Sequence, residues 1–159
     1  PAVLEAWFSG SEAGNALADV VFGAVNPSGK LPFTFPVRLE DNSAHALGEY
    51  PGSDKVTYNE SIFVGYRWHD KQELKPLFAF GHGLSYTTFD IACVKADRTT
   101  LAANGRIRIS ANVTNTGSRE GSEVVQLYIG DEKSSLPRPV KELKGFQKIA
   151  LKPLSLIHI

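Results

Sequence analysis

The sequence predicts two structural styles in one chain: an α/β fragment of the strand–helix–strand type, followed by an all-β sandwich. Near the N-terminus, apolar residues recur at helical spacing between two short apolar runs. From Phe89 onward they alternate with polar residues, which is typical of half-buried strands. The 159 residues correspond to about one ordinary domain in length.

The α/β pattern begins with Ala2–Phe8, an apolar run that we expect to be a buried strand. Ser9 and Glu12 then form an S-x-x-E capping box, which favours a helix start because each side chain satisfies a free N–H. Gly23 is placed to end this helix. Leu31–Phe35 lies between prolines and is expected to be a short or edge strand. The helix would carry one apolar stripe, made of Ala13, Ala16, Leu17, Val20 and Val21.

The connection Gly23–Lys30 contains a predicted turn at Asn26–Gly29. It does not fit the phosphate-binding loop, because five residues instead of four precede Gly29 and Leu31 stands where Ser or Thr is required. It also follows a helix, whereas phosphate binds at the N-terminus of one. We therefore predict no phosphate-binding loop here.

Residues 37–88 show no regular period but contain many turn-forming residues. A disordered linker would be poorer in aromatic residues, so this segment is predicted to be an irregular strap packed against other parts of the protein. Its aromatic residues include Tyr50, Tyr58, Phe63, Tyr66 and Trp68.

Residues 89–159 alternate in the manner of short strands separated by turns, which indicates a β-sandwich. Asn115-Thr116-Gly117 and Gly130-Asp131 are the turn signals. The apolar positions of the two clearest strands are Ile107, Ile109, Ala111 and Val113, then Val125, Leu127 and Ile129.

Composition excludes several classes of partner. The 17 basic and 17 acidic residues balance, which argues against nucleic acid and a membrane surface as partners. No apolar run is long enough to span a bilayer, and no signal peptide is visible. Cys93, the one cysteine, excludes an internal disulfide and is expected to be a small core residue. The chain starts at Pro1 and contains no Met, so we expect a fragment or a processed product.

The stretch FGHGLSYTTF, Phe80–Phe89, raises the question of a catalytic triad made of His82, Ser85 and Asp90. The G-x-S-x-G elbow of a serine nucleophile is absent. We expect His82 and Ser85 to make local turn hydrogen bonds as hinge residues. We also expect Phe80 and Leu84 to be buried, with no carboxylate completing a triad.

Other candidate chemistry is weaker. A glycosidase needs two carboxylates facing one sugar, and no spacing singles out a pair. No metal site is expected, because no histidines have zinc-motif spacing. Two glycosylation sequons, Asn59-Glu60-Ser61 and Asn112-Val113-Thr114, are short enough to occur by chance. The carboxylates considered are Glu5, Glu12, Asp19, Glu49, Glu60 and Asp70, and the histidines are His45, His69, His82 and His158.

Five segments follow one another along the chain: AWFSGSEAGNALADVVFGAVNPSGKLPFTFP, YNESIFVGYRW, PLFAFGHGLSYTTF, VTNTGSREGSEVVQLYIGD and RPVKELKGFQKIALKP. In this order they resemble the C-terminal portion of glycoside hydrolase family 3 β-glucosidases and β-xylosidases. The resemblance extends from Ala2 to about Pro153, nearly the whole chain.

The resemblance implies that 1–36 is the C-terminal end of an α/β sandwich domain, 37–88 the connecting segment, and 89–159 a fibronectin type III-like, immunoglobulin-like sandwich. It implies a retaining, exo-acting enzyme that cleaves β-linked oligosaccharides or glycosides without a cofactor, in the periplasm or outside the cell. The Asp nucleophile and the Glu acid/base of the family lie upstream of these motifs. No catalytic, cofactor-binding or metal-binding residue is therefore carried over to this chain, whose partners would be its missing N-terminal domains.

The final residues depart from the family pattern, which continues with Gly-Glu and another strand or two. Leu154–Ile159, LSLIHI, is therefore expected to be non-native, and the sandwich to be truncated with an unpaired edge. The alternative to a structural fragment of a glycosidase is a free-standing immunoglobulin-like module for carbohydrate binding or adhesion. An N-terminal apolar strand and helix that lack partner strands favour the fragment.

Overall fold

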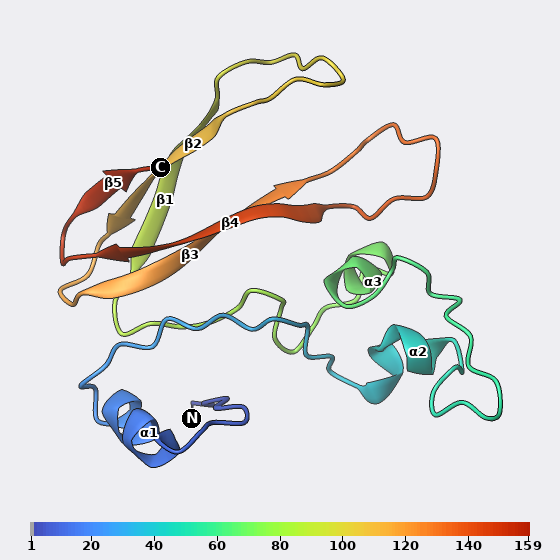
Figure 1. Ribbon diagram of the computed structural model, residues 1–159, viewed down its shortest axis with the longest axis horizontal. Coiled ribbons are helices and arrows are strands. Elements are labelled where there is room, and N and C mark those ends of the chain that lie inside the picture. Colours follow the sequence, from blue (N-terminus) through green and yellow to red (C-terminus); the bar gives the residue numbers. More distant parts are fainter. Residues whose placement is uncertain (1) are drawn as a thin grey trace. The chain divides into compact units, whose positions relative to one another are not determined.

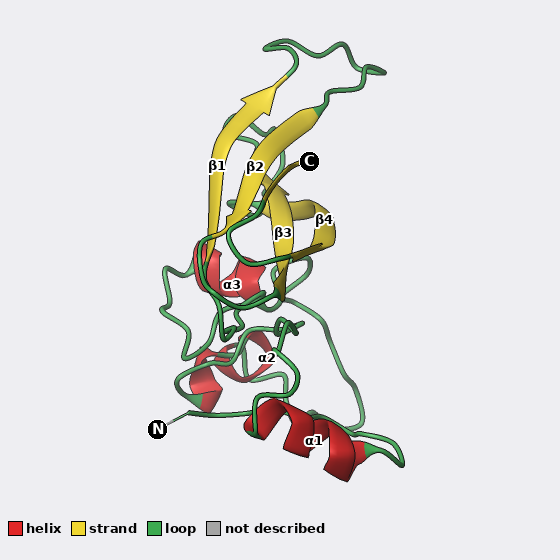
Figure 2. Cartoon of the chain, turned by 90° about the vertical axis from the view of Figure 1, so that its left-hand side faces the viewer, coloured by secondary structure: helices red, strands yellow, loops and turns green. Residues whose placement is uncertain are grey.

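The computed structural model describes residues 2–159 (Figure 1). Short helices precede antiparallel strands, with long loops between them (Figure 2). The helical elements are α1 (Ala13–Val21), the 3-10 helix η1 (Leu39–Asp41), α2 (Ser43–Ala46) and α3 (Tyr66–Lys71). The strands are β1 (Phe89–Ala96), β2 (Ile109–Asn115), β3 (Gly121–Ile129), β4 (Glu142–Leu151) and β5 (Leu156–His158). The predicted class, a helix-bearing segment followed by an all-β part, is confirmed at this level.

The chain forms two compact units, each built from distant parts of the sequence. The first unit contains the chain through Ser28, then Leu84–Glu123 and Ile149–Ile159. The second unit contains Gly29–Gly83 and Val124–Lys148. No helix in the described part of the chain has the length and apolarity needed to cross a bilayer.

The strands form two antiparallel sheets. One sheet has the order β1-β2-β5, and the other pairs β3 with β4. In β2 the predicted alternation is confirmed at Ala111 and Val113, which are buried between half-buried neighbours. It is wrong at Ile107, which is exposed and precedes the strand, and Ile109 is half-buried. In β3 the alternation is wrong, because Ser122–Tyr128 are all half-buried. Neither face of β3 is therefore fully solvated, as an alternating pattern would require.

Two predicted strands near the N-terminus are wrong. Ala2–Phe8 is not a strand, and Val3 and Phe8 are exposed. A strand needs another strand to pair with its N–H and C=O groups, and no strand of the described chain pairs with this segment. Leu31–Phe35 contributes only a single bridge, from Phe35 to Phe78. Pro32 and Pro36 lack the N–H groups that a longer ladder would require.

Helix α1 confirms one predicted end and corrects the other. It ends at Val21, and Gly23 follows with a positive φ of 81°, as expected for a C-terminal glycine. The capping box is wrong, because the Ser9 hydroxyl donates to the Ala6 carbonyl and the Glu12 carboxylate accepts from the Asn15 amide. Neither side chain caps the helix, which begins after Glu12 without a side-chain cap bond.

The helices α2 and α3 lie in the segment predicted to be irregular. Helix α2 has four residues, and the Asn42 side chain caps it by accepting from the Ala44 N–H. Helix α3 has six residues and buries Trp68 and His69. Helices this short have little intrinsic stability in water, so tertiary packing maintains them and the local pattern does not reveal them.

One residue of β1 and one segment near the C-terminus also differ from prediction. Cys93 is exposed, not buried. It lies in edge strand β1 where the register with β2 shifts between Ala92 and Lys95, so a bulge turns its side chain out of the core. Leu156–His158, which no sequence pattern predicted to be a strand, forms β5 and covers the second edge of β2.

Candidate functional site

The stretch Phe80–Phe89 holds the candidate triad residues, and Ser85 and His82 have other partners. The expected turn bonds are present, since the His82 N–H donates to the Ala79 carbonyl at 3.0 Å and the Thr87 N–H donates to the Ser85 hydroxyl at 3.3 Å. The Ser85 hydroxyl donates to the Asn26 side-chain oxygen at 2.9 Å. The His82 ring stacks on Phe78 with ring centroids 5.6 Å apart. Within residues 2–159, no hydrogen bond joins Asp90 to Ser85 or to His82. The Ser85 side chain therefore acts as a hydrogen-bonding group, and the His82 ring acts as a packing group.

The burial expected for this stretch is wrong at Leu84, which is exposed, and Phe80 is half-buried, not buried. From Leu84 onward, residues alternate between outside and inside: Ser85 and Phe89 are half-buried and Thr87 is buried, whereas Leu84 and Tyr86 are exposed. The period of two thus begins five residues before β1, and it places Leu84 on the outer side.

The Asn26 side chain is a junction between segments that are distant in sequence. Its oxygen accepts from the Ser85 hydroxyl and from the Tyr86 N–H at 2.8 Å, and its nitrogen donates to the Glu120 carbonyl at 2.9 Å. The predicted turn at 26–29 is absent. Asn26 therefore fastens the chain after α1 both to the Phe80–Phe89 stretch and to the β2–β3 connection.

Two side chains close the C-terminal end of α1. The Tyr86 hydroxyl donates to the Val20 carbonyl at 2.7 Å, and the Arg119 guanidinium donates to the Gly23 carbonyl. The Arg119 guanidinium also lies over the Tyr86 ring, 5.4 Å from its centroid. A helix C-terminus leaves carbonyl groups without partners and favours a nearby cation, so these contacts stabilise the end of α1.

A third polar centre lies inside the β module. Asn115 is fully buried, and all its hydrogen-bonding groups find partners. Its oxygen accepts from the Thr87 hydroxyl at 2.7 Å and from the Gly117 N–H at 3.1 Å. Its nitrogen donates to the carbonyls of Arg119 at 2.7 Å and Leu151 at 3.2 Å. We call Asn26, Tyr86, Asn115 and Arg119 with these partners the junction network.

The second unit has an aromatic and ionic cluster around Tyr66 in α3. The Tyr66 ring lies 5.0 Å from the Phe80 ring and 5.8 Å from the Tyr128 ring, centroid to centroid. Its hydroxyl accepts from the Leu143 N–H at 2.9 Å. Two ion pairs, Arg67–Glu142 and Lys141–Asp70, also join α3 to β4 and the residue before it. The predicted strap is thus packed onto the strands.

The alkaline stability of the chain should depend on Tyr128. Burial, and then the neighbouring Tyr66 and Asp70, raise the pKa of the Tyr128 phenol above its ordinary value of 10.0. The contribution of the neutral phenol is present below about pH 10 and is lost as pH rises through the raised pKa. Urea unfolding between about pH 9 and pH 11 should show a larger loss of stability in the parent chain than in Tyr128→Phe. Parallel losses would contradict this assignment.

Several of the remaining carboxylates considered for catalysis have partners within their own unit of the chain. Glu5 accepts from the Trp7 N–H, Glu49 accepts from the Asn59 N–H, and Asp70 pairs with Lys141. The absence of catalytic residues from this chain stays a prediction. Of the two sequons, Asn112 bonds to His158 from within β2, whereas Asn59 lies in an exposed loop. In the described chain, no three potential ligands gather as a metal ion would require.

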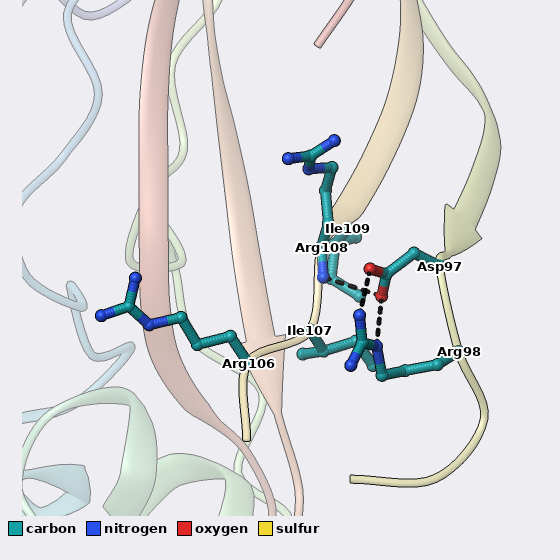
Figure 3. A pocket seen from close by; sticks show the side chains of 6 residues that line it. All are labelled: Asp97, Arg98, Arg106, Ile107, Arg108 and Ile109. Atoms are coloured by element: carbon teal, nitrogen blue, oxygen red, sulfur yellow. Dashed lines mark hydrogen bonds and ion pairs between the residues drawn. The ribbon is translucent and has the colours of Figure 1, made fainter. Parts of the chain in front are cut away.

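One open hollow lies where β1 ends and β2 begins, and we call it the arginine hollow (Figure 3). It is lined by Asp97, Arg98, Arg106, Ile107, Arg108 and Ile109. The sequence analysis did not single it out, because its charges are separated by a loop of seven residues, Thr99–Gly105. The pairing of β1 with β2, continued by the bonds between Asp97 and Arg108, brings the two sides together.

These features define the class of protein: a helix-bearing segment fastened by a polar network to an antiparallel β module. Residues 1–86 match the model of the glycosyl hydrolase family 3 C-terminal domain, and residues 123–155 match that of the fibronectin type III-like domain. The chain belongs to glycosyl hydrolase family 3.

Similar proteins of known activity or structure agree with this assignment. The chain is 52% identical over 156 residues to beta-glucosidase BoGH3A of Bacteroides ovatus, covering 96% of this chain and 21% of that protein. It is 51% identical over 152 residues to thermostable beta-glucosidase B of Acetivibrio thermocellus, covering 95% and 20%. The chain thus spans about a fifth of the length of these relatives.

Solved structures give the same result for the fold. A GH3 beta-glucosidase from Bifidobacterium adolescentis superposes with a TM-score of 0.89 at 42% identity, covering 98% of this chain and 22% of that one. Beta-glucosidase 3B from Thermotoga neapolitana, in complex with glycerol, superposes with a TM-score of 0.85 at 39% identity, covering 96% and 21%.

Proposed function

We propose that this chain is the C-terminal portion of a retaining, exo-acting β-glycosidase of the β-glucosidase type. The complete enzyme would hydrolyse O-glycosyl bonds of β-linked oligosaccharides or glycosides. An Asp nucleophile and a Glu acid/base would act by double displacement, both supplied by the N-terminal domains. The boundaries that we propose are 1–36 for the end of the α/β domain, 37–88 for the connection and 89–159 for the β-sandwich.

The work of this portion is structural. The observation that carries this proposal is the junction network. In it, the polar groups of the family motif at Ser85 and Tyr86 form hydrogen bonds with Asn26 and with the end of α1. A nucleophilic serine would need a base within hydrogen-bonding reach, whereas the Ser85 hydroxyl donates to an amide oxygen. An amide oxygen cannot serve as that base at neutral pH.

The exposed apolar surface of the N-terminal segment supports the same proposal. Helix α1 buries none of its residues, and Leu17, Val21 and Phe22 are exposed on or beside it. An amphipathic helix of this kind normally packs its apolar side against other chain. A free-standing adhesion module would have no use for this surface, so we favour the portion of a larger enzyme.

The test compares the complete protein with the 159-residue chain on an aryl β-glucoside. The complete protein should hydrolyse the substrate and release the β-anomer of the sugar first, as measured by NMR during the first turnovers. The isolated chain should give no turnover. A complete protein that releases the α-anomer first, or that does not hydrolyse β-glycosides, would contradict the proposed function.

A further inference from the structure

The arginine hollow has a fixed framework. The Asp97 N–H donates to the Arg108 carbonyl and the Arg108 N–H donates to the Asp97 carboxylate, both at 3.0 Å. These two bonds extend the pairing of β1 with β2 to the residues next to the connecting loop. The hollow is therefore formed by the end of the sheet as well as by the loop. Figure 3 shows Asp97 held between Arg98 and the backbone of Arg108.

The single acidic group of the hollow is already paired. The Asp97 carboxylate accepts from the Arg98 guanidinium at 3.2 and 3.0 Å. These bonds, with the one from the Arg108 N–H, hold the pKa of Asp97 below its ordinary value of 3.8, so it is ionised at neutral pH. One carboxylate thus faces three guanidiniums, and the charge of Arg108 also lowers the pKa of Asp97, so the hollow retains an excess of two positive charges.

These two guanidiniums differ from those of all the other arginines in the described chain. Arg38, Arg67, Arg98, Arg119 and Arg138 each pair with an acidic side chain or donate to a carbonyl. Among residues 2–159, the guanidiniums of Arg106 and Arg108 make no ion pair or hydrogen bond. The whole chain carries no net charge, so this local excess of two positive charges is not part of a general basic surface.

The directions of these side chains indicate the kind of anion. In Figure 3 the Arg106 guanidinium extends to the left and the Arg108 guanidinium extends upward, so the two are well separated. A single small anion could not contact both, whereas a polymer could present successive anionic groups to each. A guanidinium is planar and matches a carboxylate with two parallel hydrogen bonds.

The lining between the arginines favours a sugar polymer over a nucleic acid. It consists of Ile107 and Ile109, with no aromatic side chain on which a base could stack. We propose that the arginine hollow binds a carboxylated polysaccharide, with Arg106 and Arg108 contacting separate uronate groups. The choice of a glycan among polyanions rests on the proposed function. The binding site itself takes no part in catalysis, and binding requires no hydrolysis.

The test measures binding of the 159-residue chain to polygalacturonate by calorimetry at low ionic strength. The double variant Arg106→Gln/Arg108→Gln should weaken binding about tenfold, since each exposed charged contact contributes modestly. The matched control is Lys55→Gln/Lys133→Gln, which removes the same charge from exposed side chains in other loops and should leave the affinity unchanged. Circular dichroism verifies that both variants are folded.

Three results would overturn the proposal. The first is no binding of polygalacturonate to the parent chain. The second is an equal loss of affinity in both double variants, which would indicate general charge attraction. The third is binding of inorganic phosphate or single-stranded RNA at the same residues with equal or higher affinity, which would assign the hollow to a small anion or a nucleic acid. Loss of binding at high salt in the parent chain is expected, because exposed ion pairs are screened.

Discussion

Replacing Asn115 by Ala should lower the free energy of unfolding by about 3–6 kcal/mol, the largest effect that we expect from one substitution. The reason is that Asn115 is fully buried and makes four hydrogen bonds, so its removal leaves four groups without partners. Each buried group that loses its partner costs about 1–3 kcal/mol before the site relaxes. Urea unfolding followed by tryptophan fluorescence measures the effect.

The matched control for Asn115→Ala is Asn104→Ala, in the exposed loop between β1 and β2. We expect the control to change stability by less than about 0.5 kcal/mol. Thr87→Val removes one of the four partners, and its effect should not add to that of Asn115→Ala, because the two side chains bond directly. An Asn115→Ala effect no larger than that of the control would show that the buried network contributes no stability.

Replacing Asn26 by Ala should have the second largest effect, a loss of about 2–4 kcal/mol. This substitution removes the acceptor of the Ser85 hydroxyl and the Tyr86 N–H and the donor to the Glu120 carbonyl. The cost is smaller than at Asn115 because Asn26 is only half-buried, so water can replace some of the lost bonds. Hydrogen exchange of the Tyr86 amide and urea unfolding measure it.

The control for Asn26→Ala is Asn15→Ala, since Asn15 is exposed and bonds only to Glu12 in the same region. It should be neutral or slightly stabilising, because Ala favours a helix. In the complete enzyme, Asn26→Ala should lower the thermal midpoint without changing KM at a permissive temperature. A rise in KM with unchanged stability would instead place Asn26 near the substrate.

The sequence predicted those features of the structure that depend on residues close together along the chain. Gly23 ends α1 because a glycine tolerates the positive φ that its position requires. The alternation around Val113 predicted its burial, since side chains on one face of a strand share one environment. The motif around Ser85 and Tyr86 identified the family before any geometry was known.

The features that sequence reasoning missed depend on partners far away along the chain. Asn26 was assigned to a turn, but its side chain bonds to residues 59 and 94 positions later. Ala2–Phe8 has the composition of a buried strand, but a strand forms only where another strand supplies hydrogen bonds. From Leu84 to Thr87 the sequence alternates apolar Leu84 and Tyr86 with polar Ser85 and Thr87, which would place Leu84 inside. The structure has the opposite order, because the Thr87 hydroxyl bonds to the buried Asn115.

The most direct measurement of the central claim is the hydrolysis of an aryl β-glucoside by the purified 159-residue chain. The claim is that this portion stabilises a glycosidase without taking part in its chemistry. It predicts no release of the aryl group above the rate of a buffer blank, while the complete protein at the same molar concentration releases it. Turnover by the isolated chain, lost on Ser85→Ala or His82→Ala, would contradict the claim and return this stretch to the active site.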